Sequence, residues 1–203
     1  MATLREDTLE LRWLFGGASP RDVRAWFGAA DAPEERVDHY LLLPAAHELG
    51  IKLRDGRFEV KGRVGPPAPV ELGRAAGVVE GWTKWSVEDV GPISPSRALA
   101  SAAAPTLAVA KVRRRRAFAL DGREVPLLAA PSPAFLTELT DLRVEERAHW
   151  TLAVEITARD DGRGAALCRF AAAWLADCPA ALAAEDASSY AALVARAAGA
   201  EAG

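Results

Sequence analysis

The sequence predicts an α+β protein: a closed or nearly closed eight-stranded antiparallel β tunnel wrapped by helices, with further helices at the C-terminus. About eight segments alternate between apolar and charged residues, and in almost all of them the apolar positions are strongly hydrophobic, often aromatic. Because successive side chains of a strand point to opposite faces, each strand has one apolar and one charged face. A barrel of eight strands is just wide enough to hold one small ligand.

The bulk composition is typical of a globular protein. The 203 residues are 50% hydrophobic and carry a net charge of −3, which favours neither a nucleic-acid nor a membrane partner. No apolar run approaches the roughly 18 residues of a membrane span, and acids interrupt the first eleven residues, so we expect a cytoplasmic protein without a signal peptide. Cys168 and Cys178 are then expected to be reduced.

A strand and a helix are predicted near the start of the chain. Residues 8–15 alternate, and a helix follows over residues 20–27. Ser19 is a favourable N-cap, Pro20 suits the first helical position, and Gly28 can end the helix.

A further strand and a hairpin come next. Residues 35–43 predict a strand that Pro44 closes, and residues 50–63 predict two strands around the turn Asp55-Gly56. The hairpin sorts its charged residues onto one face: Lys52, Arg54, Glu59, Lys61 and Arg63.

The middle of the chain continues this pattern. Residues 77–87 form an alternating strand with Glu80, Trp82 and Lys84 on one face, and residues 94–104 predict a helix. Residues 106–128 predict a long hairpin that turns at Asp121-Gly122 and places Lys111, Arg113 and Arg115 on its charged face.

The last part changes from strand to helix. Residues 131–146 are compatible with a turn of helix followed by a strand, and residues 149–157 alternate clearly, with Glu155 on the polar side. Helices are predicted around residues 164–177 and 187–198. We therefore divide the chain into a tunnel domain over residues 1–158 and a helical extension over residues 159–203 that packs on the same domain.

The aromatic residues decide which face of the barrel points outward. The apolar faces carry Trp13, Phe15, Phe58, Trp85 and Trp150, which need cover because large exposed apolar patches are unusual. Helices on the outside can supply this cover. The charged faces then line the interior.

The predicted lining is cationic. It holds four acids, Glu10, Glu59, Glu80 and Glu155, and nine bases: Arg12, Lys52, Arg54, Lys61, Arg63, Lys84, Lys111, Arg113 and Arg115. Buried charges need partners or a ligand of opposite charge. An excess of about five positive charges inside an acidic protein suits a small polyanion, and Lys and Arg together suit phosphate.

Several segments, taken in order, resemble the CYTH superfamily of triphosphate tunnel proteins. They are "TLELR", "DHYLLLP", "GIKLRDGRFEVKGR", "VEGWTKWS", "AKVRRR" and "HWTLAVEI", and they extend roughly over residues 8–157. The family includes class IV adenylate cyclases, thiamine triphosphatases and inorganic triphosphatases. The similarity is one of pattern, so the chain resembles a divergent member.

The resemblance implies different roles for the basic and the acidic lining residues. The family's bases bind the triphosphate, and its acids hold divalent metal, here Mg²⁺ or Mn²⁺. The family's ExExK strand aligns with residues 8–12, so Glu10 is its second acid, Arg12 replaces the lysine, and Thr8 stands where the first acid belongs. The last strand offers Glu155 alone. Glu10 and Glu155 are thus the implied metal-binding and catalytic residues, and the nine bases are the implied substrate ligands.

Three functions remain open at this stage. The chain is a metal-dependent triphosphate hydrolase or related phosphoryl enzyme, a binding module for a phosphorylated ligand, or an interaction domain with a salt-bridged interior. The positive excess argues against the third. The expected partner is an inorganic polyphosphate, a nucleotide or an organic triphosphate, and the density of aromatic residues also allows a homodimer.

Overall fold

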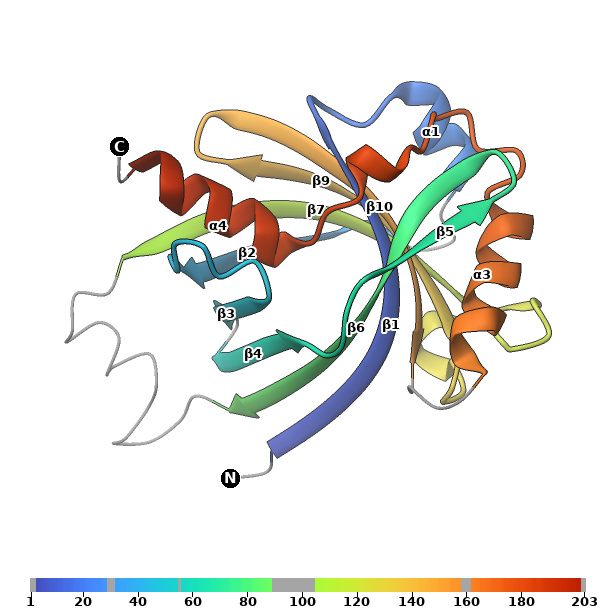
Figure 1. Cartoon of the computed structure of the whole chain (residues 1–203), viewed down its shortest axis with the longest axis horizontal. Coiled ribbons are helices and arrows are strands. Elements are labelled where there is room, and N and C mark those ends of the chain that lie inside the picture. Colours follow the sequence, from blue (N-terminus) through green and yellow to red (C-terminus); the bar gives the residue numbers. More distant parts are fainter. Residues whose placement is uncertain (1–2, 29–31, 55, 89–104, 158–161, 202–203) are drawn as a thin grey trace.

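A computed structural model describes residues 3–28, 32–54, 56–88, 105–157 and 162–201 as a closed antiparallel β-barrel with helices around it (Figure 1). The eight barrel strands pair in the order β1-β10-β9-β7-β2-β3-β4-β6, and β6 pairs with β1 to close the ring. They are β1 (Thr3–Gly16), β2 (Glu34–Leu41), β3 (Leu49–Arg54), β4 (Arg57–Arg63), β6 (Ala75–Glu88), β7 (Thr106–Phe118), β9 (Phe135–Val144) and β10 (Arg147–Thr157). The predicted fold class is confirmed.

Two short strands lie outside the ring. β5 (Ala68–Leu72) pairs with the first part of β6, and β8 (Glu124–Val125) pairs with the end of β7. The predicted hairpin of residues 106–128 is therefore only two pairs long. β8 pairs with Ala117 and Phe118 on the edge of β7 that β2 occupies farther along, and β9 pairs with the opposite edge. The segment 131–146 contains this strand, β9.

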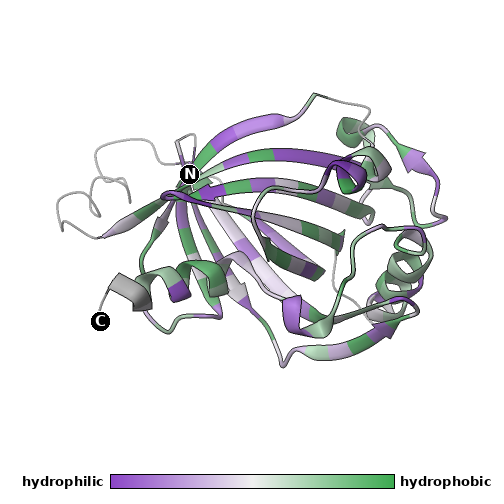
Figure 2. Cartoon of the chain, turned by 90° about the horizontal axis from the view of Figure 1, so that it is seen from above, coloured by the Kyte–Doolittle hydropathy of each residue, from purple (hydrophilic) through white to green (hydrophobic). Residues whose placement is uncertain are grey.

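The alternation along the strands separates the two faces of the barrel, and Figure 2 shows it as hydrophilic and hydrophobic bands along the ribbons. On β1, Glu10 and Arg12 line an interior cavity, whereas Leu11 and Trp13 are buried in a hydrophobic cluster on the outside. The charged faces point inward, as predicted.

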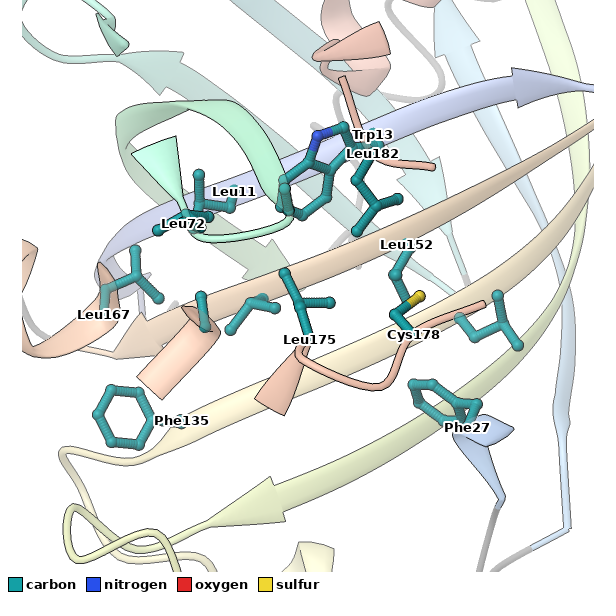
Figure 3. Packing of buried hydrophobic residues seen from close by; sticks show 14 of the residues in the cluster. Leu11, Trp13, Phe27, Leu72, Phe135, Leu152, Leu167, Leu175, Cys178 and Leu182 are labelled. Atoms are coloured by element: carbon teal, nitrogen blue, oxygen red, sulfur yellow. The ribbon is translucent and has the colours of Figure 1, made fainter. Parts of the chain in front are cut away.

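Two helices cover one side of the barrel. Figure 3 shows Leu11 and Trp13 of β1 packed with Leu167, Leu175 and Leu182 from the C-terminal part of the chain. Helix α1 (Arg21–Phe27) and helix α3 (Arg163–Trp174) supply most of this cover. The Trp13 indole N–H donates to the Ala76 carbonyl oxygen at 2.8 Å, so its buried polar atom is satisfied.

Helix α4 (Tyr190–Glu201) has a different place, beside β2 and β3 and apart from α3 (Figure 1). Its residues Leu193 and Val194 form a second hydrophobic cluster with Val109 of β7 and Val144 of β9. Val109 lies on the same strand face as Lys111, which lines the cavity. We conclude that α4 packs against inward-facing side chains and closes one end of the barrel. The sequence instead predicted that the C-terminal helices cover the outside of the barrel.

Three local expectations differ from the structure. Ser19 does not cap α1: its backbone N–H donates to Asp141, and Pro20 occupies the N-cap position without a side-chain hydrogen bond. Trp85 is 39% exposed, so the outer apolar face of β6 is not fully covered by the described residues. The predicted helix at residues 94–104 lies outside the described residues.

Candidate functional site

The barrel encloses a cavity of about 260 Å³. Ten of the eleven predicted site residues line it: Glu10, Arg12, Lys52, Arg54, Lys61, Lys84, Lys111, Arg113, Arg115 and Glu155. Arg63 was expected to join them but does not line the cavity. It forms ion pairs with Glu48 and Glu80 instead, and Glu80, which was also predicted to face the interior, does not line the cavity either.

Strand register brings the lining residues together from distant parts of the chain. Glu10 on β1 lies opposite Glu155 on β10, and Lys61 on β4 lies opposite Lys84 on β6. Glu6 on β1 lies opposite Lys84 on the other side and forms an ion pair with it. Because pairing is fixed by the hydrogen-bonded ladder, these neighbours follow from the barrel itself.

Several site residues were missed in the sequence. Strand β2 places Glu34, Arg36, Asp38 and Tyr40 on its inner face, and β9 contributes Glu138. The signal on β2 was hidden because Glu35 and His39 make the outer face polar too. Tyr190 enters the cavity from the start of α4, which no strand pattern could indicate.

The added acids reduce the predicted charge excess. Among the described residues, nine bases and five acids line the cavity, with Arg36 taking the place of Arg63. Glu34 and Asp38 are ion-paired with lining bases as well. The excess is therefore about two positive charges, where the sequence predicted about five.

The deep part of the cavity is an ion cluster centred on Asp38. This carboxylate is fully buried and faces Lys111 at 2.8 Å, Lys52 at 3.2 Å and Arg36 at 3.4 Å. Burial alone would raise the pKa of Asp38, but the surrounding cations hold it well below its usual range. Burial lowers the pKa of Lys111 strongly, and nearby Lys52 adds to this effect.

Two tyrosines complete the floor of the cavity. The Lys111 ammonium donates to the Tyr40 hydroxyl at 2.8 Å and lies 3.8 Å from the centre of the Tyr190 ring. The Arg12 guanidinium also lies over the Tyr190 ring, 4.3 Å from its centre, and donates to Glu10, Glu138 and Thr151. These deep cations are already bonded within the protein.

The outer part of the cavity is more open. Lys61, Lys84 and Arg115 keep about a third of their side-chain surface exposed, at 34%, 32% and 32%. Among the described residues each has one acidic partner, and the Glu34 carboxylate that pairs with Arg115 also pairs with Arg36 and Arg113. Burial and nearby Arg113 lower the pKa of Arg115, as expected in a cation-rich space.

Glu10 and Glu155 form an unequal pair of carboxylates. Burial would raise the pKa of Glu10, but Arg12 at 2.9 Å and Lys61 at 2.8 Å lower it to about 2. Among the described residues, none gives the Glu155 carboxylate a hydrogen bond or an ion pair, and burial together with Glu10 raises its pKa.

These two carboxylates are the hard oxygen donors that Mg²⁺ and Mn²⁺ prefer, so they fit such an ion in kind. They are few, however. No group of three or more His, Cys, Asp or Glu residues within the described ranges is placed to hold a metal ion. Further ligands would have to come from water or from a bound phosphate, as is common for Mg²⁺.

No protein-family model matches this sequence, and no curated protein matches it at a significant level. The resemblance to the CYTH superfamily therefore stays a prediction. Among the described residues, no helix is long and apolar enough to cross a membrane.

Proposed function

We propose that the barrel binds a triphosphate or another phosphorylated polyanion in its cavity. The observation that carries the proposal is the convergence of nine cationic side chains of the described chain on one small cavity, where they outnumber the described acids. Lys61, Lys84 and Arg115 supply exposed donors at the open part, and Lys and Arg together suit phosphate oxygens.

An interaction domain with a salt-bridged interior is the competing interpretation, and the smaller charge excess strengthens it. Two features favour a ligand nevertheless. The cations have too few acidic partners, since Asp38 and Glu34 each form ion pairs with three bases. The pKa of Lys52 is lowered by burial, in spite of the attraction of Asp38 and Glu59. An added anion would therefore stabilise the interior.

Metal-dependent hydrolysis of the bound triphosphate is the second candidate. Glu155 favours it, because this carboxylate lies beside Glu10 and has no ion-pair partner among the described residues. These residues would hold Mg²⁺ or Mn²⁺, an ion that supplies neutralisation of phosphate charge and Lewis-acid activation of phosphoryl transfer. The bases would orient the phosphate chain, because phosphoryl transfer depends mainly on positioning and charge stabilisation.

Calorimetric titration with tripolyphosphate tests the binding proposal, and neighbouring arginines of β7 provide a matched pair. Arg115 faces the cavity, whereas Arg114 lies on the opposite strand face and pairs with Asp141. We expect Arg115→Gln to weaken binding roughly fivefold to tenfold, since a charge-assisted contact is lost. Arg114→Gln should change the affinity less than about twofold. Equal effects of both variants, or no binding by the wild type, would contradict the proposal.

Phosphate release from tripolyphosphate and ATP, with Mg²⁺ or Mn²⁺ and with EDTA, separates an enzyme from a binding module. For an enzyme, release depends on the metal, and Glu155→Gln abolishes it while tripolyphosphate still binds. If tripolyphosphate binds but no phosphate is released under any of these conditions, the protein is a binding module and not a hydrolase of these substrates.

A further inference from the structure

Three of the described cavity acids, Glu10, Glu138 and Glu59 of β4, bind different cations with their two oxygens, but only for Glu59 do both cations come from a single neighbouring strand. Its side chain is 3% exposed, and its two oxygens bind two different cations. One oxygen lies 3.0 Å from the Lys52 ammonium, and the other lies 2.7 Å from the Arg54 guanidinium. Both cations come from β3, the neighbouring strand, and both line the cavity.

This bridging arrangement is the one that a phosphoryl group would adopt. A phosphate offers separate oxygens to an ammonium and to a guanidinium, as this carboxylate does, and it carries more negative charge. The carboxylate and a ligand phosphate therefore compete for the same donors.

We propose that Glu59 occupies, in the ligand-free protein, the position between Lys52 and Arg54 that a phosphoryl group of the ligand takes, and so sets the affinity of the cavity. This inference rests on the proposed function. It identifies the Lys52–Arg54 pair as a phosphate subsite, and it assigns Glu59 a role as an internal competitor that keeps the charges of the two half-buried cations compensated until the ligand arrives. Asp38 continues to face Lys52 after the exchange.

The proposal predicts that removing the competing charge strengthens binding. Glu59→Gln keeps the shape of the side chain, and we expect it to bind tripolyphosphate about five to ten times more tightly in calorimetric titrations, because one ion-pair competitor is lost. Glu59→Asp, whose shorter carboxylate reaches the two cations less well, should bind with intermediate affinity. It also provides a test if the amide variant does not fold.

Glu124→Gln is the matched control, because it removes the same charge from an ion pair, with Arg116, that lies outside the cavity, and Glu124 is 41% exposed. Its affinity should change less than about twofold, since an exposed pair is screened by solvent. The same gain in Glu124→Gln and Glu59→Gln would overturn the proposal by showing a general charge effect. Equal or weaker binding by Glu59→Gln would also overturn it, because Glu59 would then only position Lys52 and Arg54.

Thermal unfolding gives a second readout that separates these outcomes from a failure of the proposed function. Without anions, Glu59→Gln should melt at a lower temperature than the wild type, and tripolyphosphate should raise the melting temperature more in the variant, because bound ligand stabilises the folded state according to its affinity. An equal or smaller rise in the variant overturns the inference alone. If tripolyphosphate binds neither protein, the proposed function fails and the inference fails with it.

Discussion

Gly77 illustrates how closely the outer core is packed at the scale of single residues. A β-carbon added at this position of β6 would lie 2.8 Å from Cζ2 of Trp13 and 3.3 Å from Cδ2 of Leu11. Both neighbours are fully buried, so neither can move away freely. The glycine thus allows the large indole of β1 to lie against the backbone of β6.

Gly77→Ala is therefore expected to destabilise the protein by about 1–3 kcal/mol, the usual cost of overpacking a core. Gly62→Ala is a matched control on the neighbouring strand β4, because its added β-carbon would meet Trp85 at an ordinary 3.8 Å. Urea unfolding of both variants measures the difference. Similar unfolding free energies for the two variants would show that the contact with Trp13 is not restrictive.

At the scale of elements, α4 contributes to both the core and the cavity. Leu193 and Val194 close the barrel end, whereas Tyr190 at the start of the helix donates from its hydroxyl to Glu138 at 3.2 Å. The end of the barrel and the floor of the cavity are therefore built by the same helix. Loss of its packing should affect both.

Leu193→Ala should lower the free energy of unfolding by about 2–3 kcal/mol, because it leaves a space in the second hydrophobic cluster. Arg196→Ala on the same helix is the control: its side chain is exposed and donates to the Ser188 hydroxyl. Its effect should stay within about 0.5 kcal/mol. A small effect of Leu193→Ala would mean that α4 is not held by this cluster.

The strands were the part of the fold that the sequence could predict, because alternation on β1, β4, β6 and β10 is strict and one face of each is strongly apolar. Most lining residues on these strands follow from it, although Arg63 and Glu80 share the alternation without lining the cavity, and Glu6 lies before the predicted start of β1. Strand β2 was harder to interpret, since Glu35 and His39 on its outer face are as polar as Arg36 and Asp38 inside. The position of Tyr190 depends on how α4 docks, which no local pattern specifies.

At the scale of the whole molecule, the interior is a network of shared carboxylates whose pKa values are mostly lowered. Burial would raise the pKa of Glu34, but Arg113 and Arg36 lower it from 4.5 to about 2, and Asp38, Glu59 and Glu138 shift in the same direction. A carboxylate with a lowered pKa stabilises the folded state above its ordinary pKa, and this stability is lost as the pH falls through the lowered value.

The melting temperature should therefore fall steeply as the pH is lowered from about 5 to about 2. Glu155 shifts in the opposite direction, since burial and Glu10 raise its pKa, so it favours the folded state at lower pH and offsets a small part of the loss. Thermal unfolding over a series of pH values measures the balance. A flat profile over this range would show that the network contributes little to stability.

The closure of one barrel end by α4 also limits the routes by which a ligand can enter and leave the cavity. A ligand that enters the cavity from the opposite end must leave by the route along which it came. A long linear polyphosphate could present its terminal groups to the cations, but it could not be threaded from one end to the other. Under the proposed function, the barrel would therefore bind chain ends and short molecules, and it would release one occupant before it admits the next.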